Sequence, residues 1–269
     1  MSKDRSSSKE HNEYIKKIKT RNRAIIIVQI SILFIITLVW ELLGRYGVID
    51  TFLTSYPSEI YALFMKLVKD GSLFHHIGIS VFENIIGFLL GTLLGILVAM
   101  LLWWSKFLSK VLDPYLVILN SLPKTALAPI IILWIGAGYA GIIATAISVS
   151  IVITIMNVYN AFIAVDEEKI KMLKSFGASK IDIFKKVVLP SSIPTMIGTL
   201  KVNIGLSWVG VIVGEFLVSK AGIGYLIVYG GQVFKLDLVM MSVIVLAIIA
   251  SLMYKCVSII EKKYTRWKY

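Results

Sequence analysis

Long apolar runs separated by short polar stretches dominate the pattern along the chain. Six of these runs have about 20 residues or more, the length that a helix needs to cross a bilayer, and they lie at 24–43, 80–104, 112–135, 139–163, 192–217 and 239–260. Because the bilayer core offers no water, each run must satisfy its own backbone hydrogen bonds, which a helix does. The pattern predicts an all-α integral membrane protein with about six transmembrane helices in one domain, 24–269.

The polar segments around the first run predict a tail and a short interfacial helix. Residues 1–23 hold eight Lys and Arg residues and a serine run, which indicates a mobile basic tail. No small-residue cleavage site ends the first run, since Arg45 and Tyr46 follow it, so we expect an uncleaved span rather than a signal peptide. The spacing of apolar residues over Pro57–Lys69 predicts a helix along the outer membrane interface that is ended by Gly71.

The charge balance orients these spans. The chain is 57% hydrophobic and 16% charged, with a mean hydropathy of +0.83, yet its net charge is +12. Twenty Lys and Arg residues fall on one side of the predicted spans and five on the other; the twenty lie in 1–23, 105–111, 164–191 and 261–269. The positive-inside rule then places both termini in the cytoplasm, as six spans also require. The basic charge therefore reflects topology, and no nucleic-acid partner is expected.

Motifs for catalysis, metal binding or nucleotide binding are missing from the sequence. The single Cys256 excludes an internal disulfide, and no G-x-x-x-x-G-K-[ST] run is present to cradle ATP phosphates. Gly136–Gly141 spells G-x-G-x-x-G but joins two spans without the strand that a dinucleotide site needs. His75 and His76 are adjacent and diverge on a helix, so they make a poor metal site. We therefore expect no catalytic residue, no metal and no directly bound cofactor.

Polar residues within the spans are candidates for a translocation path, because such residues tend to face the bundle interior or a solute pathway. The third span is interrupted by Pro114, Pro123 and Pro129, which free backbone carbonyls beside Lys124, a side chain that either attracts an anion or pairs structurally. The candidate path residues are Lys124, Thr154, Asn157, Lys201, Asn203, Ser207, Trp208 and Glu215. Hydrogen bonding between helices is the alternative role for each. In the second span, glycines at every fourth position over Gly87–Gly95 indicate close approach of another helix.

The connection 164–191 is the most informative polar segment. Its acidic start at Asp166, its helical apolar spacing and the following Gly177 predict one short helix with a glycine stop. Apolar residues spaced through 181–188 predict a second short helix that closes before Pro190. Two amphipathic helices around a glycine indicate a docking element for a soluble partner, the alternative being that they pack only on the protein's own bundle.

This loop resembles the cytoplasmic loop of the permease subunits of bacterial ABC importers. In that family the loop reads E-A-A, three residues, G, nine residues and I-x-L-P. Here Gly177 is followed by nine residues and then by Val187-Val-Leu189-Pro190, while Lys171-Met-Leu173 stands at the E-A-A positions. The resemblance implies a loop that couples to an ATPase, with Asp166, Lys174, Phe176, Gly177, Ala178, Phe184, Leu189 and Pro190 as its residues.

Further stretches are similar to the branch of these permeases that serves sulfonate, nitrate and taurine uptake, a branch that also includes systems for thiamine precursors. These stretches are Asp113-Pro114, the run from Leu122 to Gly136, Val165-Asp166, Trp208, Gly214-Glu215, the run from Ala221 to Gly224, and Trp267. Together they extend the resemblance over residues 50–267, so that only the tail and the first span are generic.

The resemblance implies a type I ABC importer permease with a MetI-like helical bundle, in the bacterial cytoplasmic membrane. Such a subunit pairs with a second copy of itself around a path for a small solute, such as a sulfonate, taurine, nitrate or a thiamine-precursor-like compound. It couples to two cytoplasmic ATP-binding subunits, and an extracytoplasmic solute-binding protein delivers the solute. ATP is used by the partner ATPase, so this chain is not itself an enzyme.

Three other classes fit parts of the pattern. A self-sufficient secondary transporter is expected to show inverted repeats and acidic residues within its spans, whereas no repeat is evident here and the acidic residues lie mostly at span ends. A membrane enzyme needs nucleophile, base or metal residues that converge at one depth, and His, Cys and Asp are few. A scaffold explains the docking loop but not the broken third span. The secondary transporter is the main alternative.

Overall fold

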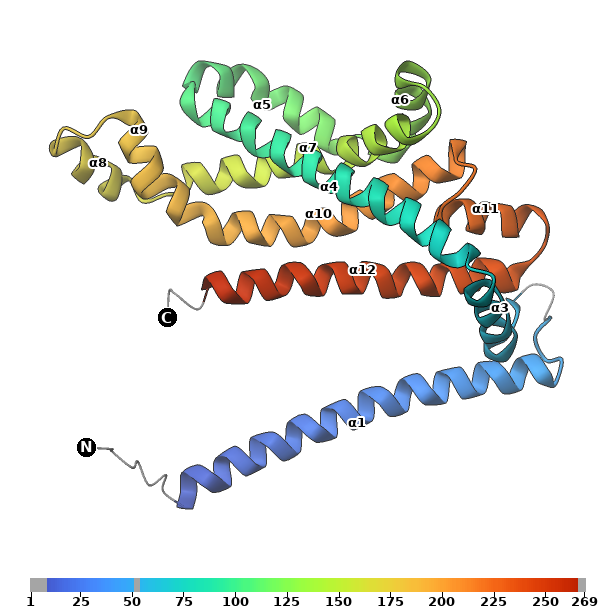
Figure 1. Ribbon diagram of the computed structural model, residues 1–269. Coiled ribbons are helices and arrows are strands. Elements are labelled where there is room, and N and C mark those ends of the chain that lie inside the picture. The colour runs from blue at the N-terminus through green and yellow to red at the C-terminus, as the bar shows by residue number, and fades with distance from the viewer. Residues whose placement is uncertain (1–8, 51–53, 266–269) are drawn as a thin grey trace. The chain divides into compact units, whose positions relative to one another are not determined.

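The computed structural model of the protein describes residues 9–50 and 54–265, so the serine run near the start and Trp267 lie outside the described residues. The described residues form helices joined by short turns (Figure 1), which confirms the predicted all-α fold. The chain divides into two units, Met1–Ala62 and Leu63–Tyr269. The boundary after Ala62 falls inside the region 24–269, which was predicted to be one domain. The first predicted span, 24–43, therefore lies in a different unit from the other five spans.

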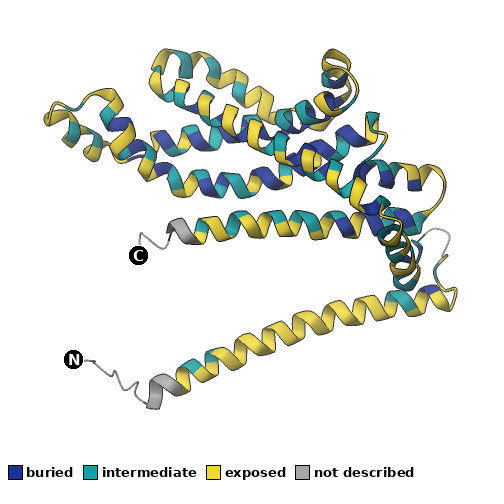
Figure 2. Ribbon diagram, viewed as in Figure 1, coloured by how far each residue is buried: buried dark blue, intermediate teal, exposed yellow. Residues whose placement is uncertain are grey.

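Helix α1 (Lys9–Arg45) carries the first predicted span and begins well before it. The prediction of a mobile tail over 1–23 is therefore wrong from Lys9 onward, where the chain is helical. Lysine and arginine are good helix formers, and a helix that has nucleated in an apolar run propagates readily into such a sequence. The apolar run of α1 is exposed along its length (Figure 2), as suits a helix surrounded by lipid.

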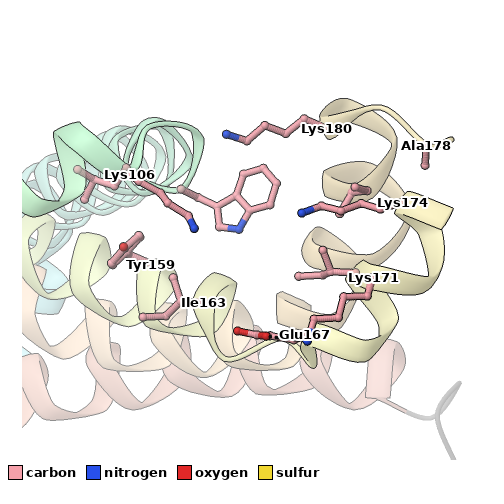
Figure 3. A pocket seen from close by; sticks show the side chains of 12 residues that line it. Lys106, Tyr159, Ile163, Glu167, Lys171, Lys174, Ala178 and Lys180 are labelled. Carbon is pink, nitrogen blue, oxygen red and sulfur yellow. Dashed lines mark ion pairs between the residues drawn. The ribbon is translucent and has the colours of Figure 1, made fainter.

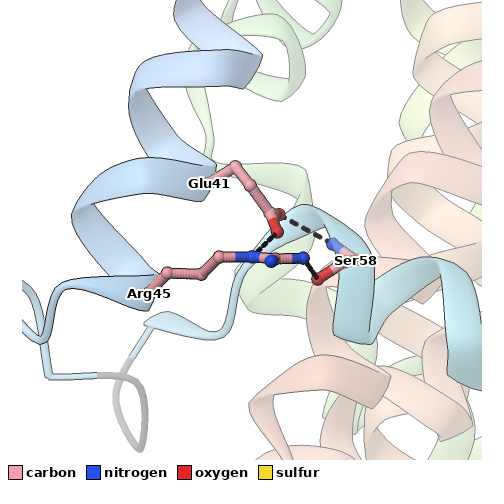
Figure 4. Close-up of polar contacts among 3 residues, drawn as sticks. All are labelled: Glu41, Arg45 and Ser58. Carbon is pink, nitrogen blue, oxygen red and sulfur yellow. Dashed lines mark hydrogen bonds and ion pairs between the residues drawn. The ribbon is translucent and has the colours of Figure 1, made fainter.

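A small polar network ties the end of α1 to the start of α3 (Pro57–Lys69), as Figure 4 shows. Glu41 accepts hydrogen bonds from Arg45 Nε at 2.5 Å and from the Ser58 backbone N–H at 2.9 Å. The second bond satisfies one of the free N–H groups in the first turn of α3. Helix α3 has the bounds that its apolar spacing predicted, and Gly71 follows it at φ +77°.

Asp70 holds the junction between α3 and the next helix. Its Oδ1 accepts hydrogen bonds from the Ser72 hydroxyl at 2.6 Å and the Ser72 backbone N–H at 2.9 Å. These two bonds favour the ionised carboxylate and hold the pKa of Asp70 below its ordinary value. The cap lets the next helix begin at Ser72, before the apolar run that starts at residue 80.

Three long helices form the centre of the second unit: α4 (Ser72–Trp104), α7 (Tyr139–Ile163) and α10 (Leu189–Val218). Helix α7 packs along both α4 and α10 (Figure 1). The predicted glycine strip lies at the α4–α7 contact, where a Cβ added at Gly87 would lie 2.7 Å from Ala146 Cβ and one at Gly95 would lie 2.6 Å from Thr154 Cβ. The glycines therefore let the two backbones approach closely, as their spacing predicted.

The third predicted span, 112–135, is not one straight helix. It is divided among α5 (Lys106–Ser121), the short 3₁₀ helix η1 (Lys124–Leu127) and α6 (Ala128–Ile135). The chain bends by 91° at the break after α5. Only Pro123 lies at the break, because Pro114 sits within α5 and Pro129 occupies the first turn of α6, where its missing N–H costs no helical bond. The interruption predicted from the prolines is thus confirmed, and its position is set by one of them.

The connection 164–191 contains α8 (Glu167–Ser175), α9 (Lys180–Ile183) and the π-helical turn η2 (Phe184–Val188). Helix α9 and η2 continue directly into α10, so that Lys180–Val218 forms one continuous helical stretch. The prediction of a second short helix that closes before Pro190 is therefore wrong. The Leu189 N–H reaches the Phe184 carbonyl in the widened turn, and this turn accommodates the ring and the missing N–H of Pro190.

Two further helices, α11 (Ile223–Gln232) and α12 (Leu236–Thr265), pack against each other and against α10. Among the residues that the structure describes, five helices are long and apolar enough to cross a membrane, and the bent pair α5 and α6 makes a sixth if it counts as one span. This count agrees with the six apolar runs in the sequence. Several helices extend beyond the predicted runs, because polar residues continue a helix that an apolar segment has nucleated.

Candidate functional site

The coupling segment, residues 164–191, consists of two helical pieces joined at a glycine. Asp166 caps α8 by accepting a hydrogen bond from the Glu168 N–H at 2.9 Å. At the other end of α8, Gly177 and Ala178 donate backbone hydrogen bonds of 3.0 and 3.1 Å to carbonyls of the last turn. Gly177 has φ +75°, the left-handed conformation that this Schellman arrangement requires. The predicted start and stop of α8 are confirmed.

Helix α9 is fixed by its own cap and by the end of α4. Ser179 Oγ accepts a hydrogen bond from the Asp182 N–H at 3.2 Å, and Asp182 Oδ2 accepts one from the Ser179 N–H at 3.3 Å, which forms a capping box. Lys180 Nζ lies 5.4 Å from the Trp103 ring centroid and 5.3 Å from that of Trp104, and it also bonds the Trp104 carbonyl. Cation–π attraction therefore holds the start of α9 against α4.

Phe184 anchors the coupling segment in the bundle. Its side chain is only 6% exposed, and its ring centroid lies 5.0 Å from that of Trp103 on α4 and 5.4 Å from that of Phe162 on α7. Val188, one turn later, is fully buried in the same cluster, and Leu189 packs against it. Of the predicted coupling residues, Phe184 and Leu189 therefore act from inside the protein, where they attach the segment to α4 and α7.

The opposite side of the coupling segment exposes apolar side chains. Met172, Phe176 and Ile181, here the exposed apolar set, are 54%, 79% and 51% accessible. Apolar side chains on a helix that is already packed on its other face indicate a surface that another protein covers. Asp166, Lys174, Gly177 and Pro190 are also exposed. One face of the coupling segment therefore packs on the bundle while the other faces outward, and docking of a partner on the outward face stays a prediction.

A basic cavity of about 600 Å³ lies between the coupling segment and the ends of α4 and α7 (Figure 3). Its four lysines are Lys106, Lys171, Lys174 and Lys180. Glu167 also lines it and pairs with Lys171 at 3.3 Å. Lys174 and Ala178, both predicted coupling residues, therefore border a positively charged hollow.

Several predicted path residues meet in a buried polar ladder between α4, α7 and α10. The Asn203 amide donates hydrogen bonds to Thr154 Oγ1 at 2.7 Å and to Thr92 Oγ1 at 2.9 Å. Further along α10, Ser207 bonds the Asn84 side chain at 2.8 Å, and Trp208 Nε1 lies 3.2 Å from that amide. These side chains are 4% exposed or less, apart from Thr92 at 7%. These side chains therefore form hydrogen bonds between helices, which is the alternative role that the sequence left open for them. Their part in a translocation path stays a prediction.

Glu215 lies in a second buried cluster at the far end of α10. Its carboxylate accepts hydrogen bonds from Ser80 Oγ at 2.5 Å and from the backbone N–H groups of Gly224 and Tyr225 at 2.6 and 3.3 Å. Ser80 Oγ in turn accepts from the Ile223 N–H at 2.7 Å. The carboxylate thus fixes the start of α11, whose free N–H groups attract negative charge.

The remaining predicted path residues lie apart from these clusters. Lys124 donates to the Asn120 carbonyl at 3.0 Å, at the break after α5. Lys201 forms an ion pair with Glu261 on α12 and lies 5.8 Å from the Tyr254 ring centroid. Both lysines therefore have structural partners. Asn157 lines a separate hollow of about 500 Å³ between α7 and α10.

Helix α4 supplies polar residues that the sequence analysis did not single out. They are Ser80, Glu83, Asn84 and Thr92, all buried. The statement that acidic residues lie mostly at span ends missed Glu83, which is inside α4. The sequence did contain a signal for these residues, since Glu83 and Asn84 are adjacent within a long apolar run. Ionisable residues at such positions are costly and tend to serve a function.

Comparison with known proteins identifies the family. The family model described as "Binding-protein-dependent transport system inner membrane component" matches residues 91–267. The chain belongs to this family. It is 27% identical over 87% of its length to a protein of Bacillus subtilis named as an aliphatic sulfonates transport permease, and 30% identical over 86% to one of the same name from Escherichia coli; the matches cover 85% and 88% of those proteins.

The fold agrees with that assignment. A solved structure of the MetNI methionine ABC transporter in an inward-facing conformation superposes with a TM-score of 0.63, at 18% identity, over 71% of this chain and 95% of the matched one. This confirms the type I, MetI-like bundle expected from the sequence. The protein is thus a multi-span membrane permease subunit of the ABC importer type, and the family assignment weighs against the self-sufficient secondary transporter.

Proposed function

We propose that this permease subunit imports a small organic sulfonate and is driven by ATP hydrolysis on a separate cytoplasmic ATPase. In this proposal the permease pairs with a second copy of itself, binds two ATPase subunits and receives its solute from an extracytoplasmic binding protein. Both termini and the coupling segment then face the cytoplasm, as the charge asymmetry favours. No cofactor binds the permease directly. The sulfonate rests on the named function of the two relatives.

The exposed apolar set on the coupling segment is the observation that carries this proposal. Phe176 is 79% exposed directly beside the Schellman turn at Gly177, so the turn presents it outward on a defined backbone. An exposed aromatic residue on a rigid helix end is the kind of anchor that fills a pocket on a protein partner. Lysines around it suit a partner surface with acidic groups.

The continuous helix Lys180–Val218 provides a physical link between docking and transport. One end carries part of the coupling segment, and the other carries Glu215, which holds the start of α11. When closure of the ATPase moves the coupling segment, a continuous helix transmits the displacement to its far end. The π turn η2 interrupts the regular α-helical hydrogen bonding along this stretch, and such turns are frequent at functional sites.

Substitution of Gly177 tests the coupling. Gly177→Val forces a β-branched residue to φ +75°, which costs about 1–2 kcal/mol and reorients Phe176. Gly71→Val is a matched control, because Gly71 has φ +77° and, like Gly177, open space around it, but lies outside the coupling segment. We expect Gly177→Val to insert normally, with sulfonate uptake lost and basal ATPase activity retained. Normal uptake by Gly177→Val would refute the coupling role.

The sulfonate is tested separately. Cells that express the permease with its ATPase and binding protein are expected to take up radiolabelled ethanesulfonate, and deletion of the ATPase should abolish this uptake. Uptake that persists without the ATPase would instead favour a secondary transporter. If the cells take up an uncharged solute but no ethanesulfonate, a sulfonate is rejected as the transported solute.

A further inference from the structure

Lysines from three separate elements converge on the basic cavity between the coupling segment and the bundle. Lys106 begins α5, Lys171 and Lys174 lie on α8, and Lys180 begins α9. In Figure 3 the side chains of Lys106 and Lys174 point into the cavity from opposite sides. Glu167 is the one carboxylate among the described residues that line it. Because like charges repel, a bound anion would stabilise this cluster.

Two of the four lysines have no acidic partner in the described part of the chain. Lys171 pairs with Glu167, and Lys180 is held by the two tryptophans at the end of α4. Neither Lys106 nor Lys174 forms an ion pair within the described residues. A lysine ammonium group brings three donors and a full charge, which suits the oxygens of a phosphate group. Lys106 and Lys174 therefore offer a site for a phosphate-type anion.

The rest of the lining is largely apolar and aromatic. It includes Leu102 and Trp103 on α4, Tyr159 and Ile163 on α7, and Ile183 on α9. Sites of this character, with a few charged groups set in an apolar wall, bind molecules that carry an apolar body as well as a charge. An amphiphilic anion therefore fits the cavity better than an inorganic ion does.

The cavity also lies at the end of a membrane span, where lipid headgroups are found. Trp103 and Trp104 are the last residues of α4, and tryptophan concentrates at the level of the headgroups. Leu97, Leu101 and Trp104, here the apolar strip, share one face of α4 and are exposed. Trp104 contacts Lys180 at 5.3 Å from its ring centroid, so the apolar strip adjoins the cavity.

We propose that this cavity binds the phosphate group of an anionic phospholipid, with Lys106 and Lys174 as its ligands and an acyl chain along the apolar strip. Basic pockets between transmembrane helices are suited to such headgroups. The inference rests on the proposed function only for the side of the membrane, since the orientation proposed there places the cavity at the inner leaflet. None of the exposed apolar set lines the cavity, so the lipid and the ATPase use different faces of the coupling segment.

Lipids with identical acyl chains test the proposal. The full-length permease in detergent is titrated with dioleoylphosphatidylglycerol and with dioleoylphosphatidylcholine, and native mass spectrometry measures the affinity of each. We expect the anionic lipid to bind roughly 25-fold more tightly, at about fivefold for each of the two lysines. Equal affinities for the two lipids would overturn the proposal.

Two charge-matched double variants locate the site. Lys106→Gln with Lys174→Gln removes both proposed ligands, so phosphatidylglycerol should fall to the affinity of phosphatidylcholine. Lys110→Gln with Lys185→Gln removes two exposed lysines outside the cavity lining and should keep the preference. A folded Lys106→Gln, Lys174→Gln protein with the wild-type preference would contradict the assignment. If that protein does not fold, Lys106→Gln alone should lose about fivefold in affinity for phosphatidylglycerol, and no loss would contradict the assignment equally.

Two competition experiments distinguish the lipid from other anionic partners. Glycerophosphoglycerol has the same headgroup without acyl chains, and at equal concentration it should leave the bound lipid in place. Displacement of the lipid by this compound would make the cavity a site for a free anion and overturn the proposal. Addition of the ATPase subunits should also leave the lipid bound, whereas its release would assign the cavity to the docking surface and overturn the proposal.

Uptake in cells separates this proposal from the proposed function, because lipid binding is measured on the permease without transport. A permease that prefers phosphatidylglycerol but imports no sulfonate would reject the sulfonate importer and support the lipid site. Sulfonate uptake by a permease without any lipid preference would retain the importer and reject the site.

Discussion

Asn203 on α10 donates a hydrogen bond of 2.7 Å to the Thr154 hydroxyl on α7. The same amide donates to Thr92 on α4, so one side chain joins all three central helices. The Thr154 hydroxyl in turn donates a hydrogen bond of 2.8 Å to the Ser150 carbonyl, within α7. Lipid tails offer no hydrophobic drive for helices to associate, so close packing and bonds of this kind set how the three helices fit together.

Asn203→Ala is expected to destabilise the bundle. The change removes two buried interhelical hydrogen bonds, which together contribute about 1–2 kcal/mol in a membrane protein. Unfolding in mixed detergent, followed by circular dichroism, measures the loss. Val202→Ala is the control, since Val202 is 50% exposed on the same helix. Equal stability of the two variants would mean that the Asn203 bonds contribute nothing net.

Gly95→Leu is expected to prevent normal assembly of α4 and α7. Its Cβ alone would lie 2.6 Å from Thr154, and real Cβ atoms do not approach that closely, so the helices must separate. Gly198→Leu is the matched control, because nothing lies within 4 Å of a Cβ at Gly198. The yield of monodisperse protein after size exclusion distinguishes them. Comparable yields would show that the glycine strip is not needed for packing.

The two phenylalanines of the coupling segment should have opposite phenotypes. Phe184→Ala removes a buried ring and is expected to cost about 3–5 kcal/mol of stability. Phe176→Ala removes an exposed ring, so stability should hold while association with the ATPase subunits weakens. Thermal unfolding and co-purification with the ATPase provide the two readouts. A Phe176→Ala protein that copurifies as well as the wild type would remove Phe176 from the docking surface.

Exchange of Lys201 and Glu261 separates structure from transport. The two side chains are 20% and 29% exposed and form an ion pair between α10 and α12. Lys201→Glu alone should lower protein yield and uptake, because it places two carboxylates together. The double variant Lys201→Glu with Glu261→Lys restores the pair, so both readouts should recover if Lys201 is structural. Recovered yield without recovered uptake would instead place Lys201 on the solute path.

Local signals were sufficient wherever a feature depends on near neighbours in the chain. Asp166 and Gly177 bracket α8 as predicted, because a helix cap and a left-handed stop are set by a few adjacent residues. The bounds of α3 and the strip Gly87–Gly95 were predicted for the same reason. Pro190 misled the analysis, since proline usually ends a helix, and nothing in the sequence showed that a π turn would accommodate it.

By itself, the sequence determined the all-helical class, the number of apolar runs, the charge asymmetry and the family, because these depend on composition, period and motif spacing. Only the tertiary structure decided which polar residues meet. Glu83 and Glu215 are far apart in the chain, and they adjoin because α4 and α10 pack side by side. Thr154 and Lys201 both looked like path residues, yet one lies in an interhelical ladder and the other in an ion pair. A side chain's partner across a bundle depends on helix rotation and packing distance, which apolar periodicity leaves open.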